Sequence, residues 1–402
     1  MPAAAGPYVG PTPIVKLLIY SHAFAPQVGG VETFSMYLAR ELALLGSEED
    51  SEGFAVTVVT NTPLRGETES WNTGFEIARE PSTRMLWKLI GKTDRVLLAG
   101  PAILPLLFAL IRRKPVAVTH HGYQLICPNG MLFQFSKQRI CPGHFAAKRY
   151  MECVKCNAGQ AKFSGSVRLL ALTFVRRLLS RFANWNVAVS EHVSCRIAMP
   201  ETRVIRNGVP DSGLRSVAPD AHSGGPCSFA YLGRLITEKG VPVLIEAASI
   251  LKMRGRIFQI LLIGDGPERK GLQAQVSSLH LDQEVQFLGF LKGAPLQEAM
   301  RRVSALVMPS ICEDAAPFSV LEQMMQGRLI IGSNLGGLAE QIGDSGLTFT
   351  AGDAMALAGL MERVIEEPGL IQRLGRMARE RALQSYTQQR MINEYKLLLS
   401  TG

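Results

Sequence analysis

ALVMPSICEDAAPFSVLEQMMQGRLIIGSNLGGLAEQI, residues 305–342, carries the strongest structural pattern of this 402-residue chain. Its apolar run at residues 305–309 predicts a short buried strand, residues 318–327 predict a helix, and residues 329–332 predict a second strand. The Gly-Gly pair at residues 336–337 is typical of a turn before another helix. This pattern predicts a βαβ unit whose chemistry lies at the strand ends.

Two carboxylates, Asp314 and Glu322, lie on either side of the predicted helix start. The backbone N–H groups of Ala316, Phe318 and Ser319 lie between them. Free N–H groups at a helix N-terminus suit an anion, whereas carboxylates accept hydrogen bonds from hydroxyls. A sugar nucleotide, which carries both phosphates and hydroxyls, would use all of these groups. The alternative is an ordinary N-terminal cap with a solvated glutamate.

Seven further blocks follow one another along the chain: PQVGGVE (26–32), HGYQLICP (121–128), VSE (189–191), IRNGVP (205–210), YLGRLITEKG (231–240), LIGDGPE (262–268) and FLGFL (287–291). Together with the pattern at residues 305–342, they resemble the retaining glycosyltransferases of family 4, also called group 1. The resemblance covers nearly the whole chain. It implies an α/β chain with the GT-B fold, in which two doubly wound Rossmann-like domains face each other across a cleft. It also implies retaining transfer of a sugar from a nucleotide diphosphate sugar to a hydroxyl.

Two cations, Arg234 and Lys239, follow a predicted strand in the block GRLITEKG. In water-poor surroundings such a pair can neutralise a diphosphate leaving group without a metal; solvated surface charges are the alternative. The resemblance implies that both hold the pyrophosphate, that Glu322 holds the nucleotide ribose, and that Asp314 holds sugar hydroxyls. It implies no cofactor for catalysis, and we place Phe318 and Ser319 with the donor-binding residues.

Two sites are predicted in the first half of the chain. Gly29 and Gly30 lie in the first strand-to-helix turn, where glycines let a backbone approach a phosphate, although a bare tight turn is the alternative. His121 follows a predicted strand at residues 116–119, and the resemblance implies that it approaches the transferred sugar. The chain departs from the family in having Gly122 where Asp commonly follows, and Asp314 where Glu is usual.

The order of strands and helices predicts two domains. We expect an N-terminal, acceptor-side domain at residues 1–210, a Ser, Gly, Pro and Asp-rich linker at 211–225, and a nucleotide-sugar-binding domain at 226–383. The resemblance implies that the last helix, in residues 384–402, returns to the first domain. Residues 1–13 have no basic or apolar region of a secretory signal, so we expect a cytoplasmic protein.

The basic residues of the chain are concentrated in its first half. The net charge is +9, and between Arg84 and Arg181 seventeen Lys or Arg residues stand against two acids. Such a region would attract an anionic membrane surface, a pyrophosphate-linked acceptor or a nucleic acid. Residues 167–182 predict an amphipathic helix, for which a core-facing orientation is the commoner explanation. We expect a glycan or lipid-linked acceptor, with contact at the inner face of the membrane and no nucleic acid partner.

Four of the seven cysteines, Cys127, Cys141, Cys153 and Cys156, fall within one segment. Four thiolates suit a tetrahedral structural zinc site, with a local cysteine cluster or ordinary buried thiols as alternatives. The other three cysteines are expected to be small buried residues.

The sequence is also compatible with two other functions. An epimerase-like GT-B enzyme would turn over a sugar nucleotide without an acceptor. A zinc-dependent nucleic-acid-binding protein would use the cysteines and the basic region, but it would leave the second half of the chain unexplained.

Overall fold

The computed structural model describes residues 14–45, 53–64, 74–158, 162–213 and 226–401. The N-terminal stretch at residues 1–13 and most of the predicted linker, residues 214–225, lie outside the described residues. None of the helices in the described part combines the length and the apolar character needed to cross a bilayer.

A sheet of seven parallel strands forms the centre of the N-terminal domain, in the order β3-β2-β1-β4-β5-β8-β9. Its strands are β1 (Val15–Ser21), β2 (Phe54–Thr60), β3 (Glu76–Arg79), β4 (Arg95–Leu98), β5 (Val116–His120), β8 (Trp185–Ala188) and β9 (Arg203–Val204). The helices of this half are α1 (Gly30–Leu45), α2 (Thr83–Lys92), α3 (Ile103–Ile111), α4 (Tyr150–Ala158), α5 (Phe163–Ser180) and α6 (Glu191–Ile197).

A second sheet of six parallel strands has the order β12-β11-β10-β13-β14-β15. Its strands are β10 (Cys227–Leu232), β11 (Phe258–Ile263), β12 (Val285–Gly289), β13 (Ala305–Met308), β14 (Leu329–Ser333) and β15 (Leu347–Phe349). The helices are α7 (Val241–Met253), α8 (Arg269–Ser278), α9 (Gly293–Met300), α10 (Phe318–Met325), α11 (Gly336–Ile342), α12 (Ala354–Glu366), α13 (Pro368–Ser385) and α14 (Gln388–Ser400). Short 3-10 turns lie at η1 (Phe135–Lys137), η2 (Thr237–Lys239) and η3 (Gly343–Ser345).

The central strands are apolar along their length because helices cover both faces of each sheet. Every residue of β13 and of β14 is buried. This burial explains why both strands read as continuous apolar runs rather than as alternating ones. The doubly wound arrangement of two domains, predicted from the sequence, is confirmed.

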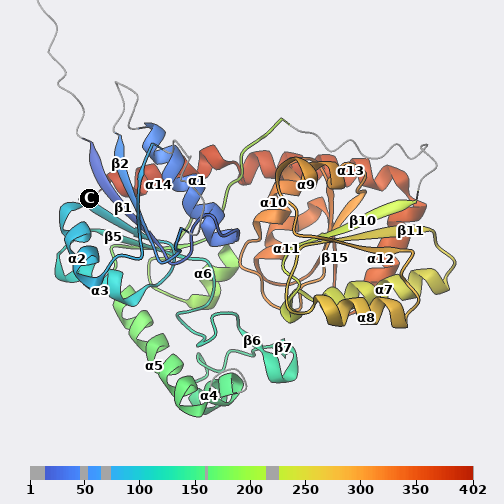
Figure 1. Cartoon of the computed structure of the whole chain (residues 1–402), viewed down its shortest axis with the longest axis horizontal. Helices are drawn as coiled ribbons and strands as arrows, with labels where there is room; N and C mark the ends of the chain where they lie inside the picture. Colours follow the sequence, from blue (N-terminus) through green and yellow to red (C-terminus); the bar gives the residue numbers. More distant parts are fainter. Residues whose placement is uncertain (1–13, 46–52, 65–73, 159–161, 214–225, 402) are drawn as a thin grey trace, which may run out of the picture.

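Two segments depart from this pattern in the N-terminal half. Helices α4 and α5, with the hairpin of β6 (Phe133–Gln134) and β7 (Arg139–Ile140), extend beyond the first sheet (Figure 1). The C-terminal helix α14 lies against α1, and the hydroxyls of Tyr395 and Thr119 are 2.9 Å apart. The last helix of the chain therefore packs on the N-terminal domain.

The core-facing interpretation of residues 167–182 is wrong for most of the exposed apolar side chains there, although Leu170 and Leu179 pack on buried clusters. Phe174, Leu178 and Phe182 are 42%, 55% and 64% exposed. The fully buried residues of α5 are instead Ser166, Thr173 and Ser180. They follow one another at a spacing of seven residues, which places them on one side of the helix. Cys195, expected to be buried, is also exposed.

The Gly-Gly turn before α11 packs directly on the segment between β13 and α10. A Cβ added to Gly337 would lie 1.7 Å from the carbonyl oxygen of Ala315, and Gly336, at φ +61°, would meet that of Asp314 at 2.6 Å. The Gly337 N–H donates to the Asp314 carbonyl oxygen at 2.7 Å. No side chain fits at either position, so the pair fixes the distance between two neighbouring loops.

Replacement of Gly337 by Ala tests this contact. Because the methyl group would overlap backbone rather than a mobile side chain, we expect Gly337→Ala to lower the free energy of unfolding by about 2–4 kcal/mol. Gly359→Ala, in helix α12, is the matched control, since no atom lies within 4 Å of a Cβ added at Gly359. It should be neutral or stabilise by ~0.5–1 kcal/mol. Urea unfolding of both variants measures the difference, and equal effects would contradict the packing argument.

Candidate functional site

The predicted site residues other than the cysteines follow the carboxyl ends of strands in the two sheets. Helix α1 of the first domain lies against the start of α10 of the second: a Cβ on Gly30 would lie 3.7 Å from Phe318, and the rings of Tyr37 and Phe318 are 6.3 Å apart. Phe318 is buried. The Gly-Gly turn at residues 29–30 and the start of α10, at Pro317 and Phe318, therefore meet across the domain boundary.

Lys239 and Asp314 form the central ion pair of this region. Their side chains are only 16% and 12% exposed, and the Ser310 hydroxyl donates to the second carboxylate oxygen of Asp314 at 2.6 Å. Burial alone would lower the pKa of Lys239, but the Asp314 carboxylate outweighs it and the pKa is raised. Lys239 is thus held as a cation in a water-poor position.

Arg234 lies in the loop between β10 and η2, beside Lys239. Its side chain is exposed, and among the described residues its guanidinium has no hydrogen-bond partner. The backbone carbonyl oxygen of Arg234 accepts a hydrogen bond from the Tyr231 hydroxyl at 2.6 Å, which fixes the loop. A planar donor beside a second cation suits a phosphate or diphosphate group.

Glu322 lies in α10, one turn from the helix start. Burial raises the pKa of its carboxyl group to about 7. Burial, and then the charge of Glu322, raise the pKa of Tyr37 to about 12, so these two side chains lie close to each other from opposite domains. Among the described residues no hydrogen bond to the Glu322 carboxylate is present. Ligand hydroxyls could therefore supply the partners that this carboxylate lacks.

Helix α10 begins without a side-chain cap. Its N-cap residue is Pro317, and no side chain accepts from the N–H groups of the first turn. Ser319 lies partly exposed in this turn. Uncapped N–H groups and the positive end of the helix dipole suit an anion, as the sequence predicted.

The first strand-to-helix turn has an unexpected neighbour. A Cβ on Gly29 would lie 2.4 Å from a carboxylate oxygen of Glu32, which belongs to the first turn of α1. Glu32 therefore folds back over Gly29, where the carboxylate interacts with the helix N-terminus. A phosphate that approached Gly29 would have to displace this side chain.

His121 follows β5 and is held as a neutral imidazole. Its ring packs edge-on against Phe34, with centroids 4.5 Å apart. Burial, with the neighbouring His120 as a second cause, lowers the pKa of His121 to about 3. His120 points elsewhere, with its Nε2 2.9 Å from the Asn186 side-chain oxygen. The Nε2 atom of His121 is buried and has no partner within the described chain.

Tyr123 is a site residue that sequence reasoning missed. Its hydroxyl is buried without a partner among the described residues. Burial raises the pKa of Tyr123, and the charges of Glu313 and Asp314 raise it further, which puts the phenol near the acidic loop of the second domain. The only sequence signal was its position two residues after His121.

Ionic contacts across the domain boundary were also missed. Glu313 accepts hydrogen bonds from His192 at 3.0 Å and from Arg196 at 2.9 Å. Glu340, in α11, accepts from the backbone N–H groups of Glu191 and His192 at 3.2 and 3.0 Å. A carboxylate of one domain thereby caps helix α6 of the other.

The four clustered cysteines meet in the segment between β5 and α5. Cys127, Cys141 and Cys153 belong to one buried apolar cluster. Burial raises the pKa of Cys153 to about 12 and that of Cys156 to about 11, and both Cys127 and Cys141 contribute to each increase. All seven cysteines are free thiols. Among the described residues, no three His, Cys, Asp or Glu side chains are arranged to hold a metal ion.

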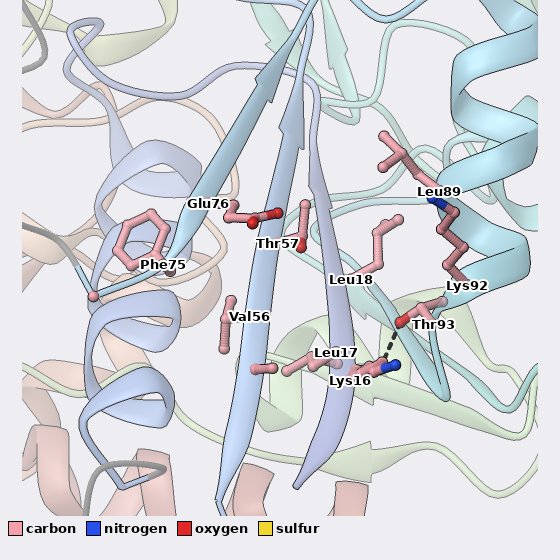
Figure 2. Close-up of a pocket in the computed structure, with 12 residues that line it drawn as sticks. Lys16, Leu17, Leu18, Val56, Thr57, Phe75, Glu76, Leu89, Lys92 and Thr93 are labelled. Atoms are coloured by element: carbon pink, nitrogen blue, oxygen red, sulfur yellow. Dashed lines mark hydrogen bonds between the residues drawn. The ribbon is translucent and has the colours of Figure 1, made fainter.

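A separate cavity of about 730 Å³ lies in the N-terminal domain (Figure 2). It is lined by the first residues of β1 and β2 and by Thr93, whose hydroxyl donates to the carbonyl oxygen of Lys16 at 2.6 Å. These are the amino ends of the strands, opposite the edge that carries His121. We therefore assign the candidate site to the carboxyl edges, where doubly wound sheets place their ligands.

The fold is that of GT-B glycosyltransferases. Over 96% of this chain and 100% of the other, the structure is similar to Anabaena HepE in complex with UDP-glucose, with a TM-score of 0.72 and 17% identity. It is similar to the sucrose-phosphate synthase of Thermosynechococcus elongatus over the same shares, with a TM-score of 0.72 and 18% identity.

Within this fold, residues 218–381 match the family model described as Glycosyl transferases group 1. Over 147 residues the chain is 32% identical to a 2-deoxystreptamine glucosyltransferase of Streptomyces kanamyceticus, covering 36% of this chain and 38% of the relative. It is 31% identical over 208 residues to a glycogen synthase of Mycobacterium tuberculosis, covering 51% and 49%.

A third relative is the putative colanic acid biosynthesis glycosyltransferase WcaL of Salmonella typhimurium, 26% identical over 44% of this chain and 46% of the relative. The chain thus matches about half the length, or less, of each of these three relatives.

The buried carboxyl group of Glu322 predicts a pH effect on stability. Its pKa in the folded protein, about 7, exceeds the ordinary value of 4.5, so the folded state binds more protons between these values and stability falls as pH rises through this window. Glu322→Gln removes the ionisation. We expect the variant to melt about 1–3 °C above wild type at pH 8 and within error of it at pH 5.

Differential scanning calorimetry without ligand measures both melting temperatures. Glu298→Gln, at an exposed helix position, is the control and should show no pH-dependent difference. A gap between Glu322→Gln and wild type that is the same at pH 5 and pH 8 would contradict the assigned pKa.

Proposed function

We propose that this protein is a retaining glycosyltransferase, similar to those of family 4, which transfers a sugar from a UDP- or GDP-sugar to a hydroxyl of a glycan or lipid-linked acceptor. The observation that carries the proposal is the pairing of Lys239 with Asp314 beside Arg234, at the carboxyl edge of the second sheet. Glu322, in the helix that follows, lies near Tyr37 of the first domain. The match of residues 218–381 to group 1 glycosyl transferases supports the same reaction class.

The cationic side chains would bind the phosphates of the donor, and the carboxylates would bind its hydroxyls. Arg234 and Lys239 would bind the diphosphate, while Glu322 would accept hydrogen bonds from the ribose hydroxyls. Asp314 would accept hydrogen bonds from hydroxyls of the sugar. UDP and UDP-glucose are bound in the structures of HepE, which supports a nucleotide sugar as the donor here.

The difficult step is the separation of charge. As the bond between the anomeric carbon and the diphosphate oxygen breaks, negative charge develops on the diphosphate and positive charge on the sugar ring. Arg234, Lys239 and the N-terminus of α10 would stabilise the departing diphosphate. The acceptor oxygen would then form its bond on the face that the diphosphate left, and its proton would pass to a diphosphate oxygen. No metal is required for this step in the proposed scheme.

The acceptor is proposed from the character of the relatives and of the N-terminal domain. Relatives include proteins named for colanic acid and amylovoran biosynthesis, which supports a role in the assembly of a cell-surface polysaccharide. The excess of Lys and Arg between residues 84 and 181 supports a pyrophosphate-linked or membrane-borne acceptor, and hence a cytoplasmic protein at the inner face of the membrane.

Donor binding is tested by thermal shift with UDP, GDP, ADP and their common sugars, with and without EDTA. We expect one nucleotide family to raise the melting temperature, with no effect of EDTA. Lys239→Ala should abolish that shift and lower the release of nucleotide from the donor sugar about 100-fold or more, because the leaving group loses a desolvated cation.

Lys88→Ala, at an exposed position of α2, is the control and should behave as wild type. Circular dichroism checks that Lys239→Ala is folded. Full turnover by folded Lys239→Ala, or no stabilisation of wild type by any nucleotide, would contradict the donor site.

For the cysteine segment we propose a structural role, with zinc as the ion that four thiolates would take. The support is their shared apolar cluster and their mutual effects on pKa. The side chains of the described residues do not themselves form a metal site, so binding would require the thiols to turn toward a common centre.

Elemental analysis of protein purified without chelator tests this role. We expect about one zinc per chain, and for Cys153→Ala with Cys156→Ala a loss of zinc together with a lower melting temperature. Cys195→Ala, at an exposed position, is the control. Absence of zinc from the native protein, with unchanged melting of the double variant, would show that these cysteines are ordinary thiols.

A further inference from the structure

Helix α5 has the reverse of the amphipathic arrangement found in a globular core. The residues it buries completely are small and polar, Ser166, Thr173 and Ser180. Six large apolar residues in α5 or just after it are exposed, and we call them the α5 stripe: Phe163, Val167, Phe174, Val175, Leu178 and Phe182. The α5 stripe therefore faces away from the side of the helix that Ser166, Thr173 and Ser180 bury, while Leu170 and Leu179 pack on the protein.

The α5 stripe is continuous along the helix. Val167, Phe174 and Leu178 follow at spacings of seven and four residues, which place them on one side of an α-helix. The stripe begins with Phe163, the first residue of α5, and ends with Phe182, two residues after the helix, and these side chains are 62% and 64% exposed. Scattered exposed apolar residues need no explanation, but a contiguous stripe marks an interaction surface.

Cations border the stripe. Lys162, Arg168 and Arg181 are exposed, and none of them has an acidic partner among the described residues. Between residues 96 and 190 the sequence has one acid, Glu152, and its carboxylate is bonded to Lys155 at 3.0 Å. An apolar stripe with cations at its borders is complementary to the surface of an anionic bilayer, where negatively charged head groups cover apolar acyl chains.

A second exposed stripe lies on the neighbouring helix. Helix α3 contacts α5 and exposes Leu104, Leu107 and Ile111 at helical spacing. Arg113, exposed at the end of α3, adds another cation. Figure 1 shows α3 near the upper end of α5, which continues away from the sheet toward α4.

We propose that α5 is an interfacial helix which docks this protein on an anionic lipid bilayer. The α5 stripe enters the boundary between head groups and acyl chains, and Lys162, Arg168 and Arg181 contact the lipid phosphates. The helix lies on the bilayer rather than across it, since no described helix is long and apolar enough to span one. A second copy of the chain is a poorer occupant because the bordering cations would face each other.

The docking surface is connected to the candidate site through one apolar cluster. Phe174 packs against Phe145 and Tyr150, with centroids 4.9 and 5.0 Å apart. Phe145 belongs to the buried cluster that contains Tyr123, and Ala315 packs on the same cluster. If the protein has the proposed function, the bilayer would hold a lipid-linked acceptor near the candidate site. Only this statement about the acceptor rests on the proposed function; the docking itself does not.

Co-sedimentation with vesicles tests the docking surface. Vesicles of phosphatidylcholine alone, and of phosphatidylcholine with about 30% phosphatidylglycerol, are mixed with the full chain. We expect binding to the anionic vesicles that weakens as salt is raised from about 0.1 to 1 M. Phe163→Ser, Leu178→Ser and Phe182→Ser combined should lower the partition constant at least about tenfold.

Two further variants separate the contributions. Met253→Ser with Ile257→Ser, which removes apolar residues 78% and 77% exposed in the second domain, should leave binding unchanged. Arg168→Ser with Arg181→Ser should remove the preference for anionic vesicles. Light scattering after gel filtration reports self-association, and thermal shift with nucleotides reports the donor site independently of docking.

Unbound wild-type protein with anionic vesicles would overturn the proposal, as would equal binding by the triple variant. A dimer that the triple variant converts to a monomer, without vesicle binding, would assign the stripe to a second copy instead. A wild-type thermal shift with nucleotides in the triple variant would show that its donor site is intact. Any loss of vesicle binding would then concern the docking surface and not the proposed function.

Discussion

The backbone contact between Gly337 and Ala315 is the constraint on which the site and the domain interface both depend. It holds the loop between β13 and α10 against the start of α11. The same loop accepts hydrogen bonds from the other domain, since Ser190 donates to the carbonyl oxygen of Ala315 at 2.8 Å and Asn207 to that of Ala316 at 3.2 Å. One segment therefore sets the position of the candidate donor site and the distance between the domains.

Electrostatics of the interface follow from the same placement. Asp314 pairs with Lys239 of its own domain, whereas the adjacent Glu313 turns to the other domain and binds His192 and Arg196. The two carboxylates thus have separate tasks. In the proposed reaction Asp314 keeps Lys239 charged before the donor arrives, so that no reorganisation is needed when the diphosphate develops charge. Glu313, like Glu340, instead stabilises the approach of the two domains.

Much of this arrangement could be predicted from local patterns. Strands such as β13 were found because burial on both faces makes them continuous apolar runs, and the fold followed from their alternation with helices. The short strands β3, β9 and β15 were missed, because edge strands of two to four residues leave no such run. The last helix, expected in residues 384–402, begins only at Gln388, because α13 continues to Ser385. Partners such as Glu340 and His192 lie far apart in sequence and need the tertiary structure. An amphipathic pattern shows that α5 has an apolar face but not what covers it.

The neutral state of His121 agrees with the charge that the proposed reaction creates. An imidazole whose pKa burial lowers to about 3 carries no charge at pH 7. A cation at this position would repel the positive charge that develops on the sugar ring, whereas a neutral ring can still form a hydrogen bond through its Nε2, which has no partner in the described part of the chain. The hydroxyl of Tyr123, also without a partner there, adds a second neutral polar group. In the proposed reaction, the first domain would offer neutral polar groups toward the sugar, and the second domain would offer Arg234 and Lys239 toward the diphosphate. This division of charge between the two domains is what separation of a sugar cation from a diphosphate anion requires.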